Sequence, residues 1–177
     1  MKRIFYLLGV ALLVSSCNSK GGGYDPYKID GGKVERKVES KSSFEVKFKE
    51  TDSKVKTIHV KLNNTGHDAI FDTGCTGVSI SRLELGELFK EGTLSEEDCR
   101  GALEVTIADN TTAILPQYNI KKLTIVDADG REHVLTDIIA TVWDNLEAPI
   151  LVGNSVIDGF AKKSYTVDLS KKVIRFE

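Results

Sequence analysis

Short segments in which apolar and polar residues alternate recur along most of this chain, and turn signals separate them. Residues 44–49 and 103–107 alternate with a period of two, and residues 165–176 form two such segments around a Ser-Lys-Lys turn. This period places one face of a strand on a core and the other in solvent. Many short strands, with turn signals about every ten residues, predict an all-β barrel or sandwich.

Two stretches differ from this pattern. Leucine and phenylalanine stand among charged residues in 83–90, directly after Ser81, which predicts a short helix with a serine cap. Ser95 opens a second candidate helical turn. Residues 138–143 are almost continuously apolar, which predicts a strand buried on both faces.

Composition excludes several functional classes. The 24 basic and 26 acidic residues give a net charge of −2, so we expect no nucleic-acid partner. The three cysteines show no CxxC spacing, and the three histidines lack the spacing of metal ligands. We therefore predict neither a metal nor a cofactor.

The first residues carry an export signal. Lys2 and Arg3 precede an apolar run over residues 4–14, which is too short to span a membrane comfortably. Val14-Ser15-Ser16-Cys17 resembles the lipobox of bacterial lipoproteins, although an ordinary secretory signal is the alternative. The resemblance implies a signal peptide over 1–16, lipid on Cys17, and a place in the cell envelope on the exported side of a membrane. Glycine-rich, polar residues 17–42 predict a flexible tether, so the folded domain covers 43–177.

One stretch carries recognisable chemistry. Residues 69–81 place Asp72-Thr73-Gly74 between two apolar segments. The carboxylate of an aspartate at the end of a buried strand must have hydrogen-bond partners or serve a function. Gly74 permits a sharp turn that directs its N–H toward the carboxylate, and the Thr73 hydroxyl can brace the loop.

Three features in order resemble the retropepsin-like aspartic proteases, and especially their lipoprotein-anchored bacterial members. They are Phe71-Asp72-Thr73-Gly74 followed by an apolar strand, a hairpin near 106–111 where the family has its flap, and Ile150-Leu151-Val152-Gly153-Asn154 before a short helix and a last hairpin. The resemblance covers roughly residues 56–177. It implies an all-β closed barrel of the acid-protease type with one or two short helices.

The resemblance also implies an activity, that of an aspartic endopeptidase. Asp72 would be the catalytic carboxylate, supported by Thr73 and Gly74. Because the chain has one Asp-Thr-Gly, two chains would form a homodimer and contribute one Asp72 each. The hairpin residues Ala108, Asp109 and Asn110 would close over an extended peptide substrate. The alternative is a lipoprotein on the same scaffold that binds a peptide or a partner without cleaving it.

Some residues keep more than one interpretation. Cys75 is a small buried side chain, a disulfide partner of Cys99, or a redox-sensitive group. Trp143 belongs either to the core, which we favour, or to a peptide cleft. The family flap usually has glycine at its tip, and asparagine at position 110 tolerates the left-handed backbone of a tight turn.

Overall fold

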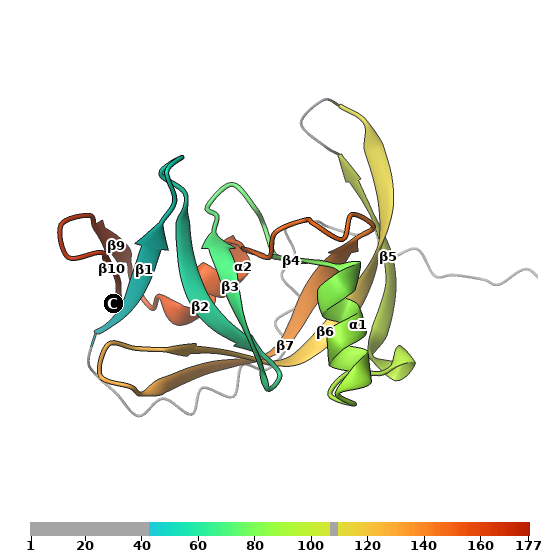
Figure 1. The fold of residues 1–177 in the computed structure, drawn as a ribbon, viewed down its shortest axis with the longest axis horizontal. Helices are drawn as coiled ribbons and strands as arrows, with labels where there is room; N and C mark the ends of the chain where they lie inside the picture. The colour runs from blue at the N-terminus through green and yellow to red at the C-terminus, as the bar shows by residue number, and fades with distance from the viewer. Residues whose placement is uncertain (1–42, 107–109) are drawn as a thin grey trace, which may run out of the picture.

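The computed structural model describes residues 43–106 and 110–177. Strands dominate this part of the chain and two short helices accompany them, so the prediction of an all-β fold with one or two short helices is confirmed (Figure 1). The strands are β1 (Phe44–Glu50), β2 (Lys56–Leu62), β3 (Thr65–Phe71), β4 (Val78–Ser81), β5 (Cys99–Thr106), β6 (Thr112–Val126), β7 (Glu132–Trp143), β8 (Leu151–Val152), β9 (Tyr165–Asp168) and β10 (Val173–Phe176). The helices are α1 (Arg82–Lys90) and α2 (Asn154–Phe160), with a 3-10 turn η1 (Glu96–Asp98).

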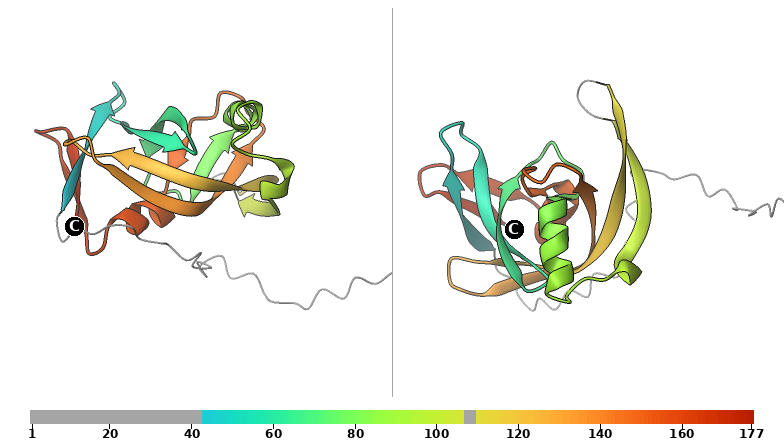
Figure 2. Two further views of the ribbon diagram at one scale, coloured as in Figure 1. Left: turned by 90° about the horizontal axis from the view of Figure 1, so that it is seen from below. Right: turned by 45° about the vertical axis from the view of Figure 1, so that its right-hand side comes forward.

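All described strands belong to one sheet, in the order β5-β6-β7-β4-β8-β3-β2-β1-β10-β9. An additional pairing of β6 with β2 closes the middle of this sheet into a ring. The β5–β6 hairpin projects from one side of the ring, and β1, β9 and β10 lie on the other (Figures 1 and 2). The ring therefore encloses the core and leaves β5 and β9 as the two edges of the sheet.

Alternation in the sequence accounts for much of the core. In β1, Phe44, Val46 and Phe48 are buried, whereas Lys47 and Lys49, which alternate with them, are exposed. β1 joins this core to the end of the chain, because Phe44 pairs with Phe176 and their rings stack at 5.0 Å. Among the described residues, no helix is long and apolar enough to cross a membrane.

The predicted helix begins where its cap was expected. The Ser81 hydroxyl accepts a hydrogen bond from the Leu83 N–H over 3.0 Å, and the Glu84 carboxylate accepts one from the Ser81 N–H over 2.8 Å. This reciprocal pair is a capping box, which satisfies two backbone donors at the start of α1. η1 likewise begins after Ser95, so both helical predictions are confirmed.

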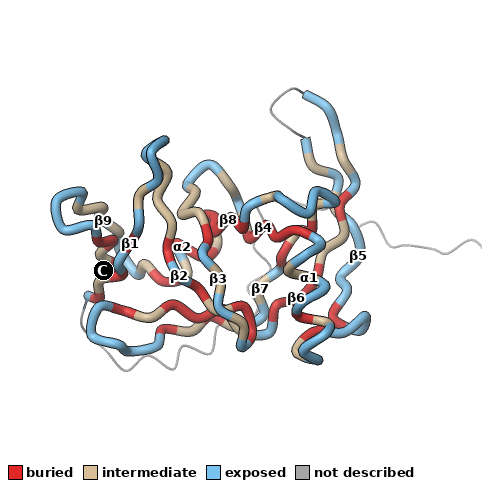
Figure 3. The backbone as a smooth tube through the Cα atoms, viewed as in Figure 1, coloured by how far each residue is buried: buried red, intermediate tan, exposed pale blue. Residues whose placement is uncertain are grey.

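The long strand β7 changes its buried face halfway. His133 and Leu135 are buried before Asp137, whereas Ala140 and Val142 are buried after it (Figure 3). Asp137 lies at this change, with φ of 57°, a left-handed backbone that breaks the regular pleat. The prediction that 138–143 is buried on both faces is therefore wrong, since Ile139 is 40% exposed.

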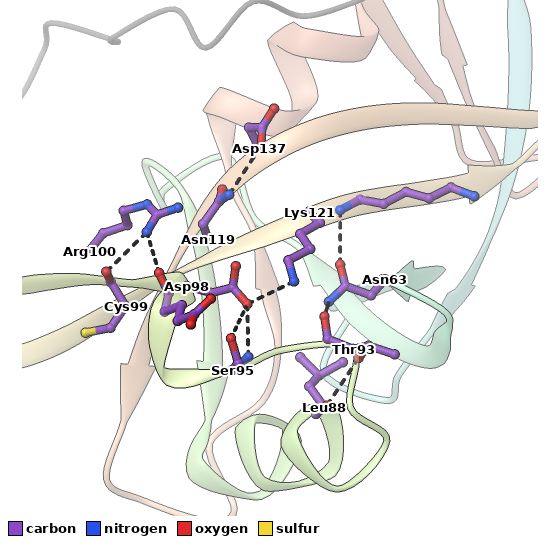
Figure 4. Close-up of polar contacts among 12 residues, drawn as sticks. Asn63, Leu88, Thr93, Ser95, Asp98, Cys99, Arg100, Asn119, Lys121 and Asp137 are labelled. Atoms are coloured by element: carbon purple, nitrogen blue, oxygen red, sulfur yellow. Dashed lines mark hydrogen bonds and ion pairs between the residues drawn. The ribbon is translucent and has the colours of Figure 1, made fainter.

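Polar contacts fix the turn between α1 and β5 against the sheet (Figure 4). The buried Asp98 carboxylate accepts hydrogen bonds from the Ser95 N–H over 2.9 Å and pairs with Lys121 of β6 at 3.1 Å. Asn63, after β2, donates to the Thr93 carbonyl over 3.1 Å. Near the bend of β7, Asn119 donates to Asp137 over 3.2 Å.

The turn between β6 and β7 is built around Asp127, whose side chain is 1% exposed. Its carboxylate accepts the backbone N–H of Asp129 and of Arg131, and His133 Nε2 lies 3.0 Å away. Burial by itself would raise the pKa of Asp127, but these hydrogen bonds outweigh it and lower the pKa to about 2. These contacts hold the segment as the turn that joins the paired strands β6 and β7.

We expect Asp127→Asn to lower the free energy of unfolding at pH 7 by about 2 kcal/mol, because the neutral amide cannot accept all the hydrogen bonds that converge on this buried carboxylate. Because the folded-state pKa is depressed, the contribution of Asp127 is present above pH 4 and fades as the pH falls toward 2. Urea titrations of both proteins between these pH values should therefore converge. Asp129→Asn, on an exposed side chain of the same turn, is the control. Equal effects of the two substitutions would contradict this account.

Candidate active site

The Asp-Thr-Gly loop begins where β3 ends. Ile70 and Asp72 donate their N–H groups to the carbonyls of Ile150 and Val152, over 2.8 and 3.0 Å, so the contact of β3 with β8 continues up to Asp72. The chain then turns, and the Gly74 N–H donates to Asp72 Oδ1 over 2.8 Å. The carboxylate is therefore oriented by the loop that it opens, as the sequence predicted for Gly74.

The position of Asp72 in the pleat directs its side chain away from the core. Phe71, one residue earlier, packs in the core. It belongs to a row of core residues that lie in register on neighbouring strands: Phe71, Val152, Val78, Ala140 and Tyr118. Successive residues of an extended chain point to opposite faces. Asp72 is accordingly half-buried on the other face, and Thr73 and Gly74 are exposed beside it.

The start of α2 holds the far side of this loop. The N–H groups of Gly153, Asn154 and Ser155 donate to the carbonyls of Gly77, Cys75 and Thr76, over 2.9, 2.9 and 2.8 Å. The Asn154 side chain also donates to the Thr73 carbonyl over 2.9 Å. Gly153 and Asn154 contributed to the resemblance, but neither residue was assigned a role at the site from the sequence. A glycine followed by a polar residue was the available signal, because glycine permits close contact between backbones.

Gly153 is required by the closeness of this contact. A Cβ atom there would lie 2.3 Å from the Cys75 carbonyl oxygen and 2.5 Å from that of Gly77. Both obstacles are backbone atoms of the loop, so no side-chain movement would relieve them. The loop and the β8–α2 junction thus form one packed unit that fixes the backbone on both sides of Asp72.

Cys75 is a free thiol that packs within the loop. Its Sγ donates to the Gly77 carbonyl over 3.3 Å. Burial raises the pKa of the Cys75 thiol, and the negative charge of Asp72 adds to this effect. Cys99 is also free and is exposed, so the described structure contains no disulfide between the two cysteines. A neutral, half-buried thiol fits the small-side-chain interpretation best.

The predicted flap is a β-hairpin of β5 and β6. Its strands pair down to Thr106 and Thr112, and the hairpin stands out from the ring in Figure 1 and in the right view of Figure 2. Asn110 has φ of 65°, which agrees with the left-handed turn expected of it. Ala108 and Asp109, which the resemblance predicts to bind substrate, lie outside the described residues, as does Cys17, the predicted lipid-bearing residue.

Trp143, at the end of β7, differs from the favoured expectation. It is half-buried and is not part of the core cluster, which holds its neighbour Val142. It pairs in register with Ser81, on the sheet face opposite Ile80 and Val142. Trp143 therefore lies on the same face of the sheet as Asp72. In the described ranges, no three histidine, cysteine or acidic side chains gather as a metal site.

This arrangement of strands, loop and flap is the fold of the retropepsin-like aspartic proteases. The chain is similar in structure to a retropepsin-like aspartic protease from Rickettsia conorii, with a TM-score of 0.51 and 15% sequence identity over 76% of this chain and 92% of that one. Residues 1–18 match the model of the prokaryotic membrane lipoprotein lipid attachment site, which identifies a lipid-anchored bacterial membrane lipoprotein. No curated protein matches the chain.

Proposed function

We propose that this lipoprotein is an aspartic endopeptidase that acts as a homodimer. The observation that supports this most is the Asp72 loop, in which the carboxylate is oriented by the Gly74 N–H and stands on the face away from the core. One such loop is half of a two-carboxylate site. A second chain, related by a two-fold axis, would supply the other Asp72.

Hydrolysis would follow from the pairing of the two carboxylates. Two adjacent carboxylates cannot both ionise cheaply, so they share one proton. The ionised Asp72 takes a proton from a water molecule, whose oxygen attacks the peptide carbonyl, while the protonated Asp72 donates a hydrogen bond to the carbonyl oxygen. The C–N bond then breaks, and the amine leaves with the proton that the initially ionised Asp72 took from the water. Thr73 would brace the two loops, and the flap, with Ala108, Asp109 and Asn110, would cover the peptide.

We further propose that the β9–β10 hairpin forms the dimer contact. β9 is an edge of the sheet, and Tyr165 at its start packs edge to face against Phe71 at 5.6 Å. Pairing of β9 with β9 of a second chain would extend the sheet at its β9 edge, and the Tyr165–Phe71 contact links this edge to β3, which leads into Asp72. Lipid on Cys17 and a tether over 17–42 would hold the domain, 43–177, at the membrane.

The test is a cleavage assay on a diverse peptide library, with the soluble domain at a series of concentrations. Specific activity should fall on dilution, in parallel with the loss of dimer in sedimentation. Mixing equal amounts of wild type and Asp72→Asn should leave about one quarter of the dimers with two aspartates, so activity per wild-type chain should fall by about half. A strictly monomeric, fully active protein would contradict the dimer. Failure to cleave any peptide at any pH would favour the binding-module alternative.

A further inference from the structure

A second row of residues crosses the sheet on the face of Asp72. Ile70, two residues before Asp72, pairs with Leu151 of β8, which pairs with Ser79 of β4. Ser79 pairs with Thr141 of β7, and Thr141 with Gln117 of β6. Residues in register on neighbouring strands project to the same side of a sheet. This row, which we call the floor row, therefore runs from beside Asp72 toward the base of the flap.

The floor row changes character along its length. Ile70 and Leu151, nearest Asp72, are apolar, whereas Ser79, Thr141 and Gln117 carry hydroxyl and amide groups. All except Ser79 are half-buried. The parallel row on the other face consists of core residues, so the floor row lies on the face away from that core.

Ser79 stands out within this row because its hydroxyl lacks a partner. The residue is 4% exposed, and its Oγ is buried without a hydrogen bond to any described group. The nearest polar group in register, the Thr141 hydroxyl, accepts from the Gln117 amide at 3.5 Å. A buried hydroxyl without a hydrogen bond raises the free energy of the folded protein, and a hydrogen bond to a ligand would remove this penalty.

We propose that Ser79 makes the substrate cleft selective for a peptide residue with a small hydrogen-bonding side chain, such as threonine, serine or asparagine, beside the scissile bond. The apolar Leu151 next to Ser79 would contact the carbon atoms of that side chain, and the Ser79 hydroxyl would bond its polar atom. A hydroxyl can both donate and accept, so either a hydroxyl or an amide fits. This inference rests on the proposed function only in placing the peptide across the face of Asp72.

Cleavage of isosteric peptide pairs tests the selectivity. Threonine and valine are exchanged at each position flanking the cleaved bond, and kcat/KM is compared for each pair. We expect wild type to prefer threonine by about tenfold at one position, since an unpaired buried hydroxyl would face valine. Ser79→Ala should bring this ratio close to one. Ser53→Ala, on the exposed β1–β2 turn, is the control and should leave the ratio unchanged.

A binding measurement keeps the inference testable without catalysis. Trp143 is the single tryptophan of the chain and lies on the face of the floor row, so its fluorescence can report peptide binding to Asp72→Asn. If wild type cleaves nothing but Asp72→Asn binds the threonine peptide more tightly, and adding Ser79→Ala removes the difference, the selectivity holds and the protease proposal fails. Cleavage with no threonine preference, or with one that survives Ser79→Ala, overturns the selectivity alone. Absence of both cleavage and binding overturns both proposals.

Discussion

Replacing Asp72 with asparagine should lower the rate of peptide cleavage by about 10³-fold or more while the domain stays folded. The amide cannot take a proton from water or share one with a second carboxylate, and such proton transfer contributes factors of this size. Asparagine keeps an oxygen that can accept the Gly74 N–H, so the loop should retain its conformation. The measurement is kcat/KM on the best library peptide, with urea unfolding of both proteins to show equal stability.

Asp68→Asn is the matched control for this experiment. Asp68 lies on β3, the strand that leads into Asp72, but it is exposed and pairs with Lys49 at 3.0 Å, so its loss should change activity little. Wild-type activity should also be highest on the acidic side of neutrality, since the working pair holds one proton. Cleavage by Asp72→Asn at nearly the wild-type rate, with contaminating proteases excluded, would make the aspartic mechanism untenable.

Replacing Gly153 with alanine should be the most damaging small substitution in the described domain. The new methyl group would meet two backbone carbonyls of the Asp72 loop at 2.3 and 2.5 Å, which only separation of β8 from the loop can relieve. That movement breaks the hydrogen bonds from the start of α2 to the loop. We expect a loss of about 3 kcal/mol or more in the free energy of unfolding, and loss of cleavage even where the protein still folds.

Gly86→Ala provides the opposite outcome within the same protein. Gly86 lies in α1 with no atom within 4 Å of an added Cβ. Alanine there should stabilise the domain by about 0.5–1 kcal/mol, because it restricts the unfolded chain and favours the helix. Urea titration of the two variants beside wild type compares them directly. A Gly153→Ala protein as stable and active as wild type would show that the loop does not depend on this contact.

The sequence was informative wherever a local pattern decides the structure. Period-two alternation located β1, Ser81 located the start of α1, and Asp-Thr-Gly located the loop at the end of β3. These features depend on neighbours within a few residues, so they can be recognised in the amino-acid sequence alone.

Features set by distant contacts were not predictable in the same way. The apolar run at 138–143 resembled a strand buried on both faces. Nothing in its sequence indicated that Asp137, just before it, has a left-handed backbone that changes which face of β7 is buried. A core position was favoured for Trp143, but its register with Ser81 places it on the other face of the sheet. The contact of Gly153 with the Asp72 loop joins residues nearly eighty positions apart, and only the fold brings them together.

The pairing of β1 with β10 has a consequence for how the domain is made. β1 leaves the ribosome about 130 residues before the strand that completes its ladder from Phe44 to Lys47. Until then Phe44 cannot stack on Phe176, and the backbone of β1 from Phe44 to Lys47 has no strand paired with it on that side. The nascent chain therefore passes most of its synthesis with this edge free to pair wrongly, and the last strand to be made is the one that protects the first.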